Sequence, residues 1–189
     1  MMAVDGGCCL AAALMLLVLP LEWILSAFTA ALVHECAHIL ALKSCGGRVR
    51  GFRVSLRGCV IHADPMPDAA AILSIAAGPV ASLLLVLLRR KAPLLAVCGL
   101  MQGLFNLLPV LPLDGGRILQ RILWRVMPKR ADAVMSALAM MLGGGLLVGT
   151  VFLYFSGKTA FWPLVLSVGF NIRLLAGKIP CKPPRIKVQ

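Results

Sequence analysis

The sequence predicts an all-α polytopic membrane protein with about six transmembrane helices and a small β-hairpin at the membrane surface. Hydrophobic residues make up 60% of the 189 residues, and the mean hydropathy is +0.95, which is well above the apolar content of soluble domains. The apolar residues gather in uncharged stretches of about the length needed to cross a bilayer. Basic residues fall in short clusters between these stretches, as expected beside lipid headgroups.

The uncharged stretches define the expected helices. The first is short, and Pro20 and Glu22 mark the turn that separates it from the second. Asp5 is the only charge before Glu22, so the chain lacks the positive start of a cleavable signal peptide and the first helix is expected to be retained. The expected helices are, in order, 6–21, 22–42, 69–88, 92–113, 133–157 and 159–177.

Two amphipathic segments lie between these helices. Phe52, Val54 and Leu56 alternate with basic or polar residues, which is strand periodicity, and a second short strand is expected over 59–62. In 117–127, three arginines spaced four residues apart line one face beside an apolar one. This pattern predicts an interfacial helix whose arginines contact headgroups.

The chain is expected to form a single membrane-embedded domain over 1–189. Its core covers about 20–125, followed by C-terminal helices over 133–177 and a basic tail over 178–189. Six spans place both termini on one side, and the distribution of basic residues then predicts that both are cytoplasmic. The cluster 89–91 and Lys158 are the exceptions. We therefore expect a multi-pass protein of a bacterial cell membrane.

The net charge of +12 does not predict binding to nucleic acid. The basic residues are not interleaved with aromatic residues, and no recognition motif is present, so the lipid bilayer is the expected partner. The seven cysteines form no CxxC pair and several lie in apolar spans. We interpret them as reduced, small apolar residues.

The strongest chemical signal is the segment HECAH, which contains two of the three histidines. On a helix, His34 and His38 lie four residues apart on one face, a spacing that suits two ligands of a tetrahedral zinc. Glu35 lies on the adjoining face, where it can activate a metal-bound water. Because a charged or metal-binding side chain in a bilayer is costly, its presence argues for use.

A third ligand is predicted by elimination, because the chain has only seven acidic residues. Glu22 lies about 18 Å from the motif along its helix, and four aspartates lie in polar surface segments. Asp114 alone ends a long apolar span on the same side as HECAH. The approach to it, NLLPVLPLDGG, contains two prolines that break the helix. Asn106 in this segment can offer its amide to a bound peptide or to exposed backbone groups.

Together, HECAH and FNLLPVLPLDGGRIL resemble the two signatures of the site-2 protease family of intramembrane zinc metalloproteases. The segment AAGPVAS is similar to the family's glycine-proline segment, although Ser82 stands where the family often has asparagine. The resemblance covers roughly 20–125. The short first helix and compact core look most similar to the sporulation-type branch, stage IV sporulation protein FB, whose members commonly carry a C-terminal nucleotide-sensing domain.

The resemblance implies one metalloprotease domain with Zn²⁺ as cofactor. His34, His38 and Asp114 would bind zinc, Glu35 would be the general base, and Asn106 would help to hold the substrate. The implied function is cleavage of membrane-associated or membrane-tethered proteins, such as a sporulation transcription-factor precursor. The resemblance also allows for a membrane regulatory protein as a partner.

The alternative is a non-catalytic membrane protein, either a metal-binding relative or a metal transporter. Polar residues repeated along several spans would favour a transporter, whereas here they concentrate at one site. An inactive relative would be expected to lack Glu35 or a ligand, and all of them are present.

Overall fold

A computed structural model describes residues 2–4, 20–55, 58–64, 66–157, 163–164, 167–169 and 171–172. Three helices of this part are long and apolar enough to cross a membrane: α2 (Leu21–Ser44), the segment Asp68–Leu88, and α6 (Ala131–Phe155). The segment Asp68–Leu88 consists of α3 (Asp68–Leu84) and the short 3-10 helix η1 (Leu85–Leu88). The helices expected over 6–21 and 159–177 lie mostly outside the described residues, so the total of six stays a prediction.

The helix expected over 92–113 is shorter in the structure. Helix α4 (Pro93–Asn106) has 14 residues and is followed by a loop that contains Pro109 and Pro112. Proline has no amide hydrogen to donate and clashes with the preceding helical turn, which is why the apolar pattern continues for longer than the helix does. The loop ends where α5 (Asp114–Val126) begins.

The described part of the chain also contains a three-stranded sheet. Strand β2 (Val49–Ser55) pairs in antiparallel fashion with β3 (Gly58–Ala63), with Phe52 opposite Ile61. These strands occupy the segment in which the sequence predicts a hairpin. The alternation of residues did not predict β1 (Met2–Val4), which pairs in parallel with the other side of β2.

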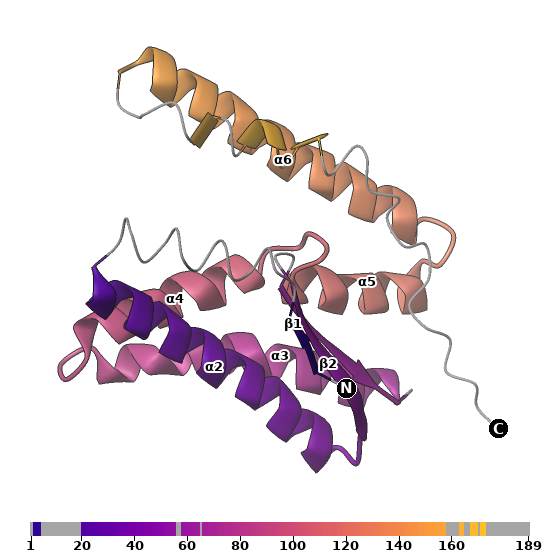
Figure 1. Ribbon diagram of the computed structural model, residues 1–189. Helices are drawn as coiled ribbons and strands as arrows, with labels where there is room; N and C mark the ends of the chain where they lie inside the picture. The colour runs from indigo at the N-terminus through magenta and orange to yellow at the C-terminus, as the bar shows by residue number, and fades with distance from the viewer. Residues whose placement is uncertain are drawn as a thin grey trace.

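Helices α2, α3 and α4 pack side by side, with the sheet beside them (Figure 1). Small residues make this packing close: Ala30, Ala71 and Ala96 are each at most 4% exposed. Side chains of this size let helix backbones approach each other, which matters in a membrane because lipid supplies little driving force for helix association.

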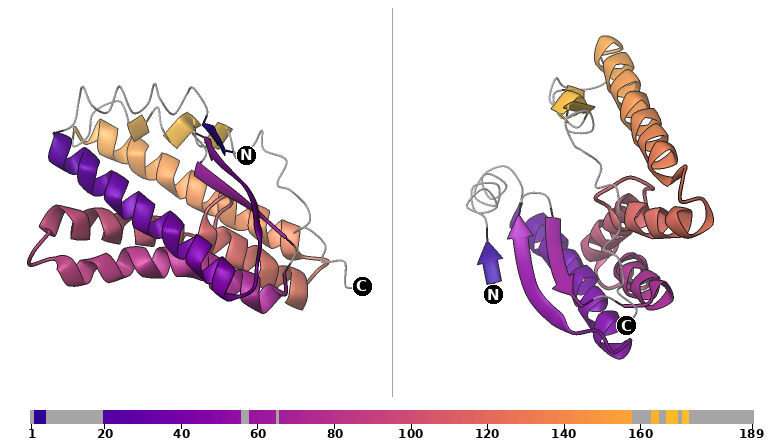
Figure 2. Two further views of the ribbon diagram at one scale, coloured as in Figure 1. Left: turned by 60° about the horizontal axis from the view of Figure 1, so that its bottom comes forward. Right: turned by 90° about the vertical axis from the view of Figure 1, so that its right-hand side faces the viewer.

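Helix α6 extends away from this group (Figures 1 and 2). It meets α5 at its first turns, where Leu123 of α5 packs against Ala131 and Met135 in a small apolar cluster. The protein therefore has a close-packed group of helices, α2 to α5, and a helix that is attached to it at one end.

Candidate metal centre

Helix α2 carries the HECAH motif with both histidines on one face. His34 is 3% exposed and His38 is partly buried, and their Nε2 atoms lie 3.1 Å apart. The four-residue spacing brings the two rings together, as the sequence predicts. The rings meet edge to face.

Asp114 reaches both histidines from the start of α5. Its Oδ2 lies 3.1 Å from Nε2 of His34 and 3.2 Å from Nε2 of His38. Burial alone would raise the pKa of Asp114, but the hydrogen bonds with the two histidines outweigh it and lower the pKa to about 2. The aspartate is therefore a carboxylate at neutral pH.

Two glycines bring Asp114 to this place. A Cβ atom at Gly115 would overlap the carbonyl of Leu107, and one at Gly116 would overlap the backbone of Val110. The first turn of α5 thus lies directly against the backbone of the preceding loop, an approach that only glycine allows. This explains the GG pair that follows Asp114.

Helix α3 orients the two histidine rings without contributing a ligand. The Nδ1–H of His38 donates to the carbonyl oxygen of Ser74 at 2.8 Å, and Nδ1 of His34 lies 2.9 Å from the hydroxyl of Ser82. A carbonyl only accepts, so the neutral ring of His38 carries its proton on Nδ1 and a lone pair on Nε2. Ser82 is fully buried and placed to accept the same bond from His34.

These contacts leave three donor atoms facing one another, two Nε2 atoms and one carboxylate oxygen. Each pair of them is 3.1–3.2 Å apart. Neighbouring ligands of a tetrahedral zinc with bonds of roughly 2.0–2.1 Å are about 3.3–3.4 Å apart. Two imidazoles and a carboxylate also form a donor set that zinc accepts. The three residues therefore fit a zinc ion in both chemistry and spacing.

The other two predicted site residues do not take part in this group. Glu35 lies on α2 beside His34 and is partly buried. Asn106 lies at the end of α4, where its amide donates to the carbonyl oxygen of Gln102 at 3.1 Å. Glu35 is thus the neighbour of the donor residue His34 on α2, and Asn106 has a hydrogen-bond partner within its own helix.

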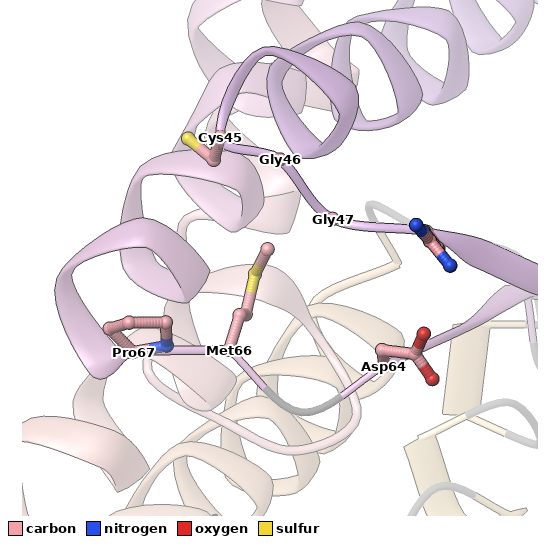
Figure 3. Close-up of a pocket in the computed structure, with 7 residues that line it drawn as sticks. Cys45, Gly46, Gly47, Asp64, Met66 and Pro67 are labelled. Atoms are coloured by element: carbon pink, nitrogen blue, oxygen red, sulfur yellow. The ribbon is translucent and has the colours of Figure 1, made fainter.

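A cavity of about 260 Å³ opens where α2 ends and α3 begins (Figure 3). Its lining includes Cys45, Gly47 and Met66, and none of the three donor residues. The sulfur of Met66 lies 4.0 Å from the hydroxyl of Ser74. Ser74, whose carbonyl oxygen binds His38, therefore lies between this cavity and the donors.

The sequence analysis singled out the segment AAGPVAS, but it did not predict that residues of α3 support the histidines. Ser74, Gly78 and Ser82 are all buried and lie four residues apart on one face. A Cβ atom at Gly78 would overlap the ring of His38, so this position must be glycine for the ring to fit. Small residues at four-residue spacing inside an apolar span were the available signal.

Residues 69–150 match peptidase family M50. This range includes Asp114 and begins after HECAH. The HECAH motif is therefore evidence that does not depend on the family match. The putative zinc metalloprotease Rip3 of Mycobacterium tuberculosis (strain H37Rv) is 32% identical over an alignment of 163 positions, which covers 69% of this chain and 42% of that protein. The chain is therefore similar in sequence to peptidase family M50 over the segment that carries Asp114.

A second curated protein and a solved structure are also similar to this chain. The putative zinc metalloprotease sll0528 of Synechocystis is 31% identical over an alignment of 138 positions, which covers 61% of this chain and 36% of that protein. The solved structure of the site-2 protease from Methanocaldococcus jannaschii has the same fold, with a TM-score of 0.62 at 21% identity, covering 92% of this chain and 87% of that one.

The chain spans about two fifths of the length of the curated relatives it matches. The match to peptidase family M50 and the group of two histidines and one aspartate support zinc as the cofactor, as the sequence predicts. The three apolar helices support an integral membrane protein. The likeness to the sporulation-type branch stays a prediction.

Proposed function

We propose that this protein is an intramembrane zinc metalloprotease that cleaves membrane-associated or membrane-tethered proteins. The observation that carries the proposal is the convergence of His34, His38 and Asp114 from two helices on one point. The match to peptidase family M50 supports it, as do the three apolar helices of spanning length in the described part of the chain.

In this proposal His34, His38 and Asp114 hold the zinc. Zinc in that position would supply a Lewis acid that acidifies water and polarises the scissile carbonyl. Glu35 accepts a proton from the attacking water and passes it to the leaving amine. Ser74 and Ser82 hold the histidine rings with Nε2 toward the metal.

The substrate must reach this site in an extended conformation, because a helix hides its peptide bonds. Strand β3 could pair with such a segment along the edge that no described strand occupies, since the sheet order is β1-β2-β3. Asn106 could hold the substrate once its amide leaves the carbonyl of Gln102.

We also propose six spans with both termini in the cytoplasm, on the basis of the charge distribution.

The narrower assignment is regulated cleavage of a sporulation transcription-factor precursor in a bacterial cell membrane, with a membrane protein as regulator. It rests on the resemblance to the sporulation-type branch. Its direct test is cleavage of such a precursor in preference to other membrane-tethered substrates.

The decisive experiment compares the purified protein with Glu35→Gln in detergent. Zinc content and cleavage of membrane-tethered substrates are measured on the same samples. We expect equal zinc in both proteins and cleavage reduced roughly 10²–10⁴-fold in Glu35→Gln, because a general base contributes about that factor. Undiminished cleavage by Glu35→Gln would refute the mechanism. Zinc bound by both proteins without cleavage by either would favour the alternative of a non-catalytic metal-binding protein or transporter.

A further inference from the structure

Helix α5 is attached to α3 at a second point, two turns beyond Asp114. The guanidinium of Arg121 donates to the Oδ1 of Asp68 at 3.0 Å. The side chain of Arg121 is only 17% exposed, and that of Asp68 is 37% exposed. The sequence pattern predicts that this arginine faces headgroups, whereas the structure turns it toward another helix.

The partner helix is the one that orients the histidines. Asp68 lies in the first turn of α3, and the same helix holds His38 through Ser74 and His34 through Ser82. A single helix therefore contacts both ligand rings and, through Asp68, the helix that carries the third ligand. No other described helix makes all three contacts.

The position of Arg121 suits control of the rotation of α5. Seven residues separate it from Asp114, which is two helical turns, so both side chains lie on one face of α5 about 10 Å apart. A rotation of α5 by about 20° would move a side-chain tip roughly 5 Å from the axis by nearly 2 Å. A shift of that size would take Asp114 out of reach of the histidines.

The other arginines of the stripe differ from Arg121. Arg117 is 38% exposed and its guanidinium lies 4.0 Å from Oδ1 of Asp114, the oxygen that does not contact the histidines. Arg125 lies in the last turn of α5 and is exposed. Arg125 therefore offers a matched control, because it has the same charge on the same face, one turn further from the metal centre.

We propose that the Arg121–Asp68 ion pair is a positioning element of the metal centre, which holds α5 at the rotation where Asp114 meets His34 and His38. The inference rests on the proposed function only in taking these three residues as the zinc ligands. Partly exposed ion pairs add little to the stability of a protein. Loss of this pair should therefore weaken zinc binding while the thermal midpoint of the metal-free protein changes little.

The test measures zinc affinity by competition with a chelator, on the full chain in detergent. The variants are Arg121→Gln, Asp68→Asn and their double mutant, with Arg125→Gln as control. We expect each single change at the ion pair to weaken zinc binding about tenfold, the lower end of what is typical of groups that orient ligands. The double mutant should bind zinc as tightly as either single mutant, because both single changes remove the same interaction. Arg125→Gln should stay within about twofold of wild type.

A second variant keeps the test valid if Arg121→Gln folds poorly. Arg121→Lys retains the charge and should recover part of the lost affinity. Equal losses of zinc affinity in Arg121→Gln and Arg125→Gln would overturn the proposed role of the ion pair. So would losses in the two single mutants that multiply in the double mutant. Neither result would contradict the proposed proteolytic function. A wild-type protein that binds zinc and cleaves nothing would instead contradict the proteolytic function, and the affinity series would still decide the role of the ion pair.

Discussion

Two clusters of polar side chains lie among the apolar helices, and they are built differently. At the metal centre, two Nε2 atoms and a carboxylate oxygen meet within 3.2 Å of one another. Beside α6, the hydroxyls of Thr150 and Ser167 lie 2.8 Å apart, and the amide of Asn171 donates to the carbonyl oxygen of Gly143 at 2.9 Å.

The difference lies in what each cluster still needs. In the cluster beside α6, hydroxyl and amide donors meet acceptors, so the group is complete and holds two segments together. At the metal centre, the inward-facing atom of neutral His38 is an acceptor, and so is the carboxylate oxygen of Asp114. Acceptors that face each other at this distance repel unless a proton or a metal cation lies between them. The metal centre can therefore take up a cation, whereas the cluster beside α6 is a packing contact.

The largest expected effect comes from removing the charge of that site. Asp114→Asn retains the shape of the side chain and loses the anionic donor. We expect zinc affinity to fall by more than the roughly 10–100-fold that is typical of changes to groups around the ligands. Cleavage should fall with it. Metal analysis after dialysis against a weak chelator measures this, and unchanged zinc occupancy would exclude Asp114 as a ligand.

A smaller but still large effect is expected at Gly78, where α3 touches the ring of His38. In Gly78→Ala, the new Cβ atom would overlap that ring, so either the ring or the helix must move. We expect zinc affinity to fall at least tenfold. The matched control is Gly149→Ala in α6, where a Cβ atom would meet nothing within 4 Å. Equal zinc affinity in the two variants would contradict the close contact between α3 and His38.

The ligands were predictable from the sequence because their residue types are rare in this chain. Two histidines four residues apart in an apolar helix, and one aspartate at the end of another span, are few enough to be found by elimination. The supporting residues were not predictable in this way. Serine and glycine are common in membrane helices, and only the fold shows that Ser82 faces His34.

A moderate effect is expected from Ser82→Ala. The change removes the group that accepts from Nδ1 of His34, so the ring can rotate and both its nitrogens lose their assigned roles. We expect zinc binding to weaken about tenfold with little loss of stability. Ser167→Ala removes an equally buried hydroxyl from the other cluster and should leave zinc affinity at the wild-type value. If both variants bind zinc equally well, Ser82 does not orient the ligand.

The ends of the helices show a second limit of sequence reasoning. Hydropathy alone extends the fourth span to residue 113, whereas α4 ends at Asn106 and the prolines beyond it form the loop before Asp114. Arginine periodicity correctly indicates a helix from 117 onward, but it does not show that Arg121 pairs with Asp68. The periodicity of a sequence predicts the face of the helix on which a residue lies. The packing of neighbouring helices determines which residues that face contacts.

The smallest effect is expected in the cluster beside α6, and it provides the sharpest test of the comparison. Thr150→Val keeps the size of the side chain and removes the hydroxyl that contacts Ser167. Because polar contacts between membrane helices are worth about 0.6 kcal/mol on average, the free energy of unfolding should fall by about that amount. Zinc affinity and cleavage should not change, since this cluster binds nothing that its own members do not supply. A loss of zinc in Thr150→Val would show that α6 takes part in the metal centre, and the distinction between a binding site and a packing contact would then fail.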